Sequence, residues 1–107
     1  MANGAKKKVV NVKAQKCADY AVIDYPQENE TVNRPSYTIR IGTSGGGHSV
    51  EISINGSDWA PCYHAAGYWW FSWANYSSGL HKIVARMRDN KGKTLAESTI
   101  RKCICKA

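Results

Sequence analysis

The amino-acid sequence predicts an all-β domain built as an antiparallel sandwich or barrel. From residue 20 to residue 100, apolar and polar residues alternate at every second position in short segments, which is the pattern of half-buried strands. Turn-forming residues interrupt these segments at intervals of about 8 to 12 residues. The spacing of an amphipathic helix is absent, apart from a weak pattern in residues 5–18.

The size of the chain sets the scale of the fold. Its 107 residues have room for one domain and one hydrophobic core, which excludes an enzyme with separate substrate and cofactor domains. Hydrophobic residues make up 43% of the chain and charged residues 21%, as in a globular domain. No apolar run approaches the roughly 18 residues of a membrane span, so membrane insertion is not expected.

The first half of the chain contains two clear strands. Residues 37–41 (YTIRI) alternate cleanly and lead into residues 43–47 (TSGGG), a loop without the lysine and the following helix of a phosphate-binding loop. Residues 50–54 (VEISI) alternate again and end in Asn55-Gly56. This dipeptide is a strong signal for a hairpin turn, because both of its positions require positive φ.

The second half continues the same pattern. Residues 68–73 (YWWFSW) are rich in strand-forming aromatic residues and precede a turn at residues 75–79. Residues 81–88 form the next strand, residues 89–93 a turn, and residues 94–100 the last strand. The inward rows of the predicted core include Ile39, Ile52, Trp73 and Ile83.

Positive charge is concentrated at the two ends of the chain. Residues 1–16 carry +5 and residues 101–107 carry +3, against +7 for the whole chain, which leaves the residues between them near −1. A nucleic-acid groove would place its cations in the folded body, so nucleic acid is not expected as a partner. The basic ends are either solvated tails or an electrostatic arm for polyanions. We therefore expect a basic segment at 1–19, a sandwich at 20–102 and a Cys/Lys tail at 103–107.

The four cysteines allow a disulfide, although their spacing limits it. Cys103 and Cys105 form a C-x-C pair, whose geometry disfavours a bond between them. The predicted bridge joins Cys17 to Cys103 or Cys105, and it would imply an oxidising compartment. Cys62 is expected to be a buried or half-buried free thiol. The cysteines lack the C-x2-C spacing of a metal knuckle, so no metal site is predicted.

The tryptophans are the strongest candidates for a binding site. If the strand at 68–73 keeps its period of two, Tyr68 and Trp70 point outward, and Trp59 lies just past a hairpin. Together on one sheet face, these three rings would form an apolar platform for stacking sugars. The alternative is that Trp70 covers a partner strand or the amino-terminal segment.

Catalysis has little support in the sequence. The eight acidic residues are scattered, and His48, His64 and His81 are isolated from one another and from any carboxylate cluster. No serine lies in a recognisable nucleophile context. We expect neither a catalytic residue nor a cofactor, and therefore a protein that is not an enzyme.

Four segments resemble a bacterial immunoglobulin-like domain over about residues 22–101. They are YPQENETV (25–32), VEISINGSDW (50–59), WFSW (70–73) and GLHKIVARMRDNKG (79–92). The resemblance implies an immunoglobulin-like antiparallel β-sandwich with Greek-key topology and about seven strands, in which His81 faces the core. Asn29 and Asn55 depart from the family pattern, which often has glycine and aspartate there, and the cysteines are not part of it.

The resemblance also frames the expected function. Such sandwiches have many roles. We expect a noncatalytic binding or spacer module that contacts proteins or glycans, with a carbohydrate-binding domain and a polyanion-binding domain as alternatives. The amino terminus has a lysine run but no apolar signal core, because polar residues interrupt it. The chain is therefore expected to be cytoplasmic as it stands, or extracellular or at the cell surface, as the resemblance implies, if a signal was removed.

Overall fold

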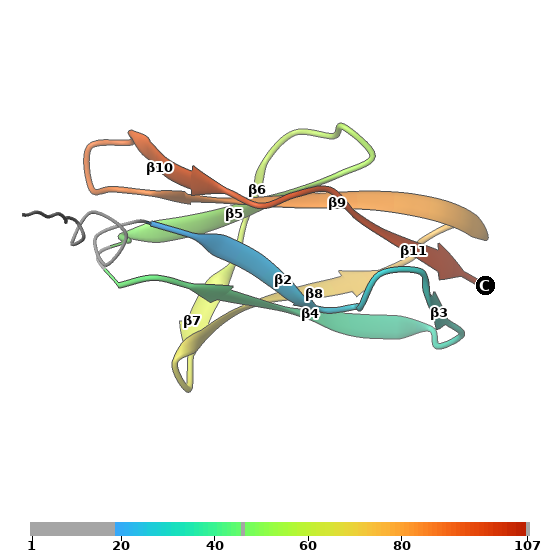
Figure 1. Ribbon diagram of the computed structural model, residues 1–107. Helices are drawn as coiled ribbons and strands as arrows, with labels where there is room; N and C mark the ends of the chain where they lie inside the picture. Colours follow the sequence, from blue (N-terminus) through green and yellow to red (C-terminus); the bar gives the residue numbers. More distant parts are fainter. Residues whose placement is uncertain (1–18, 46, 107) are drawn as a thin grey trace, which may run out of the picture.

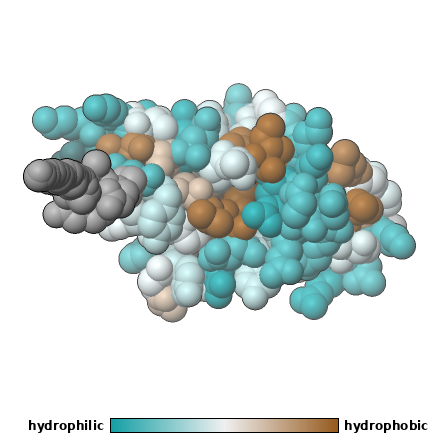
Figure 2. Space-filling model, viewed as in Figure 1, coloured by the Kyte–Doolittle hydropathy of each residue, from teal (hydrophilic) through white to brown (hydrophobic). Residues whose placement is uncertain are grey.

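A computed structural model describes residues 19–45 and 47–106 as two β-sheets packed face to face (Figure 1). The predicted basic segment at 1–19 and Cys17 lie almost entirely outside these ranges. Within them, no helix is long and apolar enough to cross a membrane. The side of the molecule in Figure 2 is mostly hydrophilic, with a few separate hydrophobic areas.

One sheet has four antiparallel strands in the order β2-β4-β8-β7. Their bounds are Ala21–Tyr25 for β2, Ser36–Thr43 for β4, Tyr68–Ala74 for β8 and Tyr63–Ala65 for β7. The other sheet has the order β3-β11-β9-β5-β6, with β10 also paired to β9. Its strands are β3 (Glu30–Val32), β11 (Arg101–Cys105), β9 (Gly79–Arg88), β5 (Ser49–Ile54), β6 (Ala60–Pro61) and β10 (Thr94–Glu97).

This architecture confirms the predicted all-β, immunoglobulin-like sandwich and refines it in two respects. The described residues form ten strands rather than about seven, since short strands are added at the sheet edges. One pair, β3 with β11, is parallel, whereas the other pairs are antiparallel.

The chain passes from one sheet to the other between β2 and β3. A cis peptide bond at Tyr25-Pro26 follows β2, and Asn29 has a φ of 62°. This left-handed conformation is one that asparagine tolerates better than most residues, which accounts for Asn29 where the family pattern often has glycine. The Asn29 amide then donates to the Lys102 carbonyl at 2.7 Å, so β3 begins in the second sheet.

The core lies between the sheets and follows the predicted alternation. Ile39, Ile52, Ile83 and Trp73 are all buried, as expected. The Trp73 ring packs on Tyr76 at 4.6 Å between centroids. The other buried apolar residues of the cluster are Ile23, Val32, Ile41, Val50, Ala85, Met87, Cys103 and Cys105.

The turn at Asn55-Gly56 has the predicted chemistry. Both residues have positive φ (57° and 76°), and the Ser57 amide donates to the Ile54 carbonyl at 3.1 Å. The Asn55 side chain fastens the turn to β9, because its Oδ1 accepts from the Lys82 amide and its Nδ2 lies 2.8 Å from Nδ1 of His81. His81 is buried, as the family resemblance implied.

The carboxy-terminal boundary differs from the prediction. The strand expected at residues 94–100 ends at Glu97, and Ser98 interrupts the pairing because its Oγ accepts a hydrogen bond from the Ala85 amide. Pairing resumes at Arg101, so Cys103 and Cys105 belong to strand β11 rather than to a tail. Both thiols face inward and are buried, since a cysteine thiol behaves as a small hydrophobic group.

Candidate functional site

Aromatic side chains and one arginine line the outer face of the four-stranded sheet. The strand register places Tyr25 of β2 opposite Arg40 of β4, Arg40 opposite Trp70 of β8, and Trp70 opposite Tyr63 of β7. These four residues form one row across all four strands, and Tyr68 lies beside it. We call the five residues the aromatic face.

Arg40 is the centre of this face. Its guanidinium carbon lies 4.2 Å from the centroid of the Tyr68 ring and 4.8 Å from that of Tyr25. Asp24 reaches the same side through an irregularity in the pairing of β2, and its Oδ2 lies 3.3 Å from Arg40 Nε. This contact is an ion pair without hydrogen-bond geometry. The arginine thus holds two aromatic rings in place, while a carboxylate balances its charge.

Trp70 is fixed before any ligand binds. Its indole N–H donates to the Ala65 carbonyl at 2.8 Å. The Tyr68 ring stands edge-on to it, with centroids 6.1 Å apart and an interplanar angle of 73°. Since the polar group of the indole is already satisfied, the half-buried ring presents apolar surface at a low cost in side-chain entropy.

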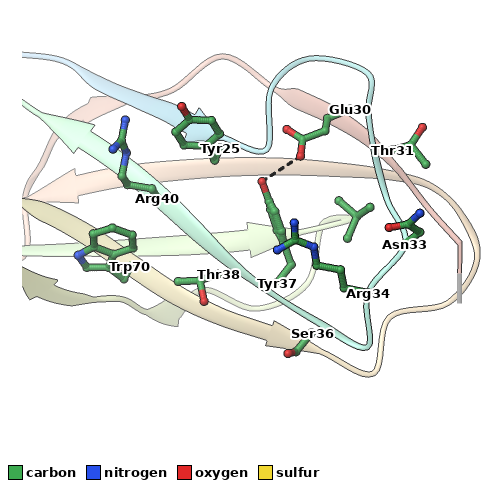
Figure 3. A pocket seen from close by; sticks show the side chains of 11 residues that line it. Tyr25, Glu30, Thr31, Asn33, Arg34, Ser36, Tyr37, Thr38, Arg40 and Trp70 are labelled. Atoms are coloured by element: carbon green, nitrogen blue, oxygen red, sulfur yellow. Dashed lines mark hydrogen bonds between the residues drawn. The ribbon is translucent and has the colours of Figure 1, made fainter.

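A groove of about 560 Å³ continues from the aromatic face toward the loop between β3 and β4 (Figure 3). Tyr25, Arg40 and Trp70 lie at one end, and polar side chains together with Val32 line the rest. These polar side chains are Glu30, Thr31, Asn33, Arg34, Ser36, Tyr37 and Thr38. Glu30 belongs to the six-stranded sheet and Trp70 to the four-stranded sheet, so the groove spans both.

Tyr37 orients the carboxylate in this groove. Its hydroxyl donates to Glu30 Oε2 at 3.1 Å. Burial and the adjacent charge of Glu30 raise the pKa of Tyr37 to about 12. The hydroxyl therefore stays protonated at neutral pH. The Gln27 amide donates to Glu30 Oε1 at 2.8 Å, so the protein orients both oxygens of this carboxylate.

The structure separates the three residues of the predicted platform. Tyr68 and Trp70 share the aromatic face, but Trp59 packs on Arg86, whose guanidinium carbon lies 4.1 Å from its ring centroid. Arg86 points outward from the six-stranded sheet, since Ala85 and Met87 on either side are buried. Trp59 therefore lies on the opposite face, and a platform that includes it is wrong.

Tyr25 and Tyr63 were absent from the sequence-based platform. Tyr63 is 52% exposed and Tyr25 is 42% exposed. Each lies at the end of a short segment with too few residues to show a period of two. Only the register against β4 and β8 reveals that they extend the row.

The histidines do not form a reactive cluster. The His64 ring packs on Trp69 at 4.7 Å between centroids, and His81 lies 2.7 Å from the Ser77 carbonyl through Nε2. Among the described residues, no three His, Cys, Asp or Glu side chains are grouped so as to hold a metal ion.

The predicted disulfide from Cys17 to Cys103 or Cys105 stays a prediction, because only the second partner of each pair lies in the described part of the chain. Cys103 is a free thiol, fully buried between the sheets opposite His81, and Cys105 is also free. Cys17 lies outside the described residues.

Burial makes the free thiols unreactive toward reagents in solution. Cys62 is half-buried and free, as predicted. Burial raises the pKa of Cys62 and of Cys103 to about 12. The thiolate, which is the reactive form, is therefore scarce at neutral pH.

Comparison with known proteins identifies the fold. No protein-family model matches the sequence, and no curated protein sequence matches it. Among solved structures, the chain is similar to fibronectin(III)-like modules of Clostridium thermocellum CbhA, with a TM-score of 0.66 and 18% identity. This match covers 79% of the present chain and 93% of that chain.

Two further structures contain the fold within longer chains. One is a modular endo-β-1,4-mannanase from Cellulomonas fimi (TM-score 0.61, 19% identity), where the match covers 80% of the present chain and 18% of that chain. The other is an engineered protein (TM-score 0.64, 19% identity), with 81% and 20% covered. At these identities the likeness establishes the sandwich fold.

Proposed function

We propose that this chain is a noncatalytic module that binds a neutral polysaccharide through the aromatic face. The observation that carries the proposal is the row of Tyr25, Arg40, Trp70 and Tyr63 across four adjacent strands. Likeness to fibronectin(III)-like modules, and to part of a modular mannanase, supports the role of an accessory module.

The dimensions of the row favour a chain of sugars over a single sugar. Neighbouring strands lie about 4.8 Å apart, so four strands space the row over about 14 Å. The apolar faces of sugar rings stack on aromatic side chains, which offer large contact area with few rotatable bonds. Tyr25, Trp70 and Tyr63 can thus contact successive units of one chain.

The groove supplies the polar half of the site. Glu30, Asn33 and Arg34 line it beyond the aromatic end and can hydrogen-bond to sugar hydroxyls (Figure 3). Charges on this side are balanced, since Asp24 and Glu30 offset Arg34 and Arg40. A neutral ligand therefore suits the site better than a polyanion does.

Titration with soluble polysaccharides tests the proposal. The panel contains neutral β-glucan, mannan and xylan, with anionic alginate and heparin for comparison, and tryptophan fluorescence reports binding. Trp70→Ala should weaken binding of a neutral polymer by about tenfold or more. Tyr63→Ala should weaken it as well, and this exposed side chain can be removed with little cost to the fold.

The matched control is Trp59→Ala, which removes the same ring from the opposite face and should leave affinity unchanged. Binding that survives both Trp70→Ala and Tyr63→Ala, or no binding to any neutral polymer, contradicts the proposal and leaves a spacer role. Binding to heparin alone, with a steep loss on adding salt, would instead favour the polyanion alternative.

A further inference from the structure

Aliphatic side chains gather on the outer face of the six-stranded sheet, where β9 begins and β11 ends. Leu80 is 55% exposed and lies directly opposite Ile104, which is 38% exposed. Ile100, just before β11, is 61% exposed. Grouped aliphatic side chains on a surface are a feature of interaction sites, whereas single ones are ordinary.

Two lysines stand in the middle of this group. Lys82 of β9 and Lys102 of β11 are directly opposite each other and exposed. Like charges in this position destabilise a sheet. In the described part of the chain, neither ammonium group has a carboxylate within ion-pair distance.

The two arginines on the same face of β9, by contrast, form ion pairs within the chain. Arg86 Nη2 lies 2.7 Å from Glu51 Oε1, and Arg88 Nη1 lies 3.3 Å from the same oxygen. Glu51 therefore neutralises the charges of both arginines. Lys82 and Lys102 have no such carboxylate partner among the described residues. An external carboxylate would remove the repulsion between the lysines.

A hollow of about 460 Å³ lies beside the lysines. Leu80, Val84 and Ile100 line it together with Ser53 and the turn at Asn55-Gly56. It is large enough to receive an apolar side chain from a partner. We call Leu80, Lys82, Val84, Ile100, Lys102 and Ile104 the lysine–aliphatic patch.

We propose that the lysine–aliphatic patch docks a protein segment that carries carboxylates next to aliphatic side chains. Charge complementarity favours this occupant, since the partner's carboxylates would face Lys82 and Lys102 while its aliphatic side chains enter the hollow. A second copy of the chain fits poorly, because a symmetric contact brings the same patch together and faces lysines with lysines.

The test uses a synthetic helical peptide with leucine and glutamate on one face. Amide signals of the patch should shift in two-dimensional NMR spectra when the peptide is added. The double variant Lys82→Glu with Lys102→Glu should lower affinity by about tenfold or more. Glutamates opposite each other repel as lysines do, so the like-charge pair destabilises the fold of the variant about as much as that of the wild type. A change in affinity then reports the contact with the peptide.

The control is Lys91→Glu with Lys93→Glu, an equal charge change in the exposed β9–β10 turn, which should leave affinity within about twofold. A peptide with lysine in place of glutamate should not bind. Unshifted patch signals, equal affinity for both peptides, or unchanged affinity in the Lys82/Lys102 variant would overturn the proposal. So would tighter binding to vesicles of phosphatidylcholine and phosphatidylglycerol, or a dimer formed through the patch.

Discussion

The two outer faces of the sandwich expose apolar surface in different ways. On the aromatic face, rigid rings surround Arg40, whose charge Asp24 balances. On the lysine–aliphatic patch, flexible aliphatic chains surround Lys82 and Lys102, whose charges are open in the described structure. Rings with balanced charge suit a flat neutral ligand, and aliphatic chains with open positive charge suit an acidic protein segment.

The largest expected effect is a loss of folding stability, on which both faces depend. Ile39 lies under the aromatic face and is fully buried in the core shared with the six-stranded sheet. Ile39→Ala should lower the free energy of unfolding by about 3 kcal/mol, because it leaves a cavity in the core. Urea unfolding followed by tryptophan fluorescence measures the loss. A variant that loses less than about 1 kcal/mol would show that the two sheets do not share one tightly packed core.

The next largest effect distinguishes the two faces by the ligand that each variant stops binding. Trp70→Ala should lower polysaccharide affinity by about tenfold while acidic-peptide affinity stays unchanged. The Lys82/Lys102 double variant should do the reverse, since the two sites point away from each other across the core. Parallel titrations of both variants with both ligands measure this. If either variant weakens both ligands while remaining folded, the faces are coupled and the comparison fails.

A smaller effect concerns Glu51, which keeps the arginines on the patch side neutralised. Burial raises the pKa of Glu51, but hydrogen bonds from Arg86 and Arg88 and their charges outweigh burial and hold the pKa below its ordinary value of 4.5. A lowered pKa in the folded state stabilises the fold above about pH 4.5, and the stabilisation is lost as pH falls further. Glu51→Gln should therefore destabilise the fold by about 1 kcal/mol at pH 7.

Urea unfolding of wild type and Glu51→Gln at pH 7 and pH 3 checks the sign of this prediction. The gap between the two proteins should narrow at pH 3. A gap that is equal at both pH values would mean that the carboxylate charge is not what stabilises this face.

The smallest effect is an absence of reaction. Cys62, Cys103 and Cys105 should resist a thiol reagent in the native protein at pH 8, because burial keeps them protonated. Under denaturing, non-reducing conditions, at least three thiols should react. A count of two would instead support the predicted bridge to Cys17.

Local alternation predicted the parts of the fold that depend on single strands. The strands around Ile39, Ile52, Trp73 and Ile83 were expected, and these side chains are buried. The turn at Asn55-Gly56 was also predictable, because positive φ at both positions is encoded locally.

The candidate site depended on long-range information that alternation lacks. The sequence placed Tyr68 and Trp70 outward, but assigning Trp59 to their face required knowing which sheet receives β6. The row from Tyr25 to Tyr63 exists only through the register of four strands that are distant in sequence. The boundary near Cys103 was misplaced because Ser98 breaks the ladder with a side-chain hydrogen bond.

The parallel pairing of β3 and β11 has a mechanical consequence. A stretching force on the two ends of the domain pulls these strands along their length in opposite directions. The bonds that flank the pair, from Asn29 to Lys102 and from Lys106 to Val32, then share the load with the ladder instead of opening one by one. In single-molecule experiments, pulling on the two ends of the domain should therefore need a higher unfolding force than pulling β10 away from β9.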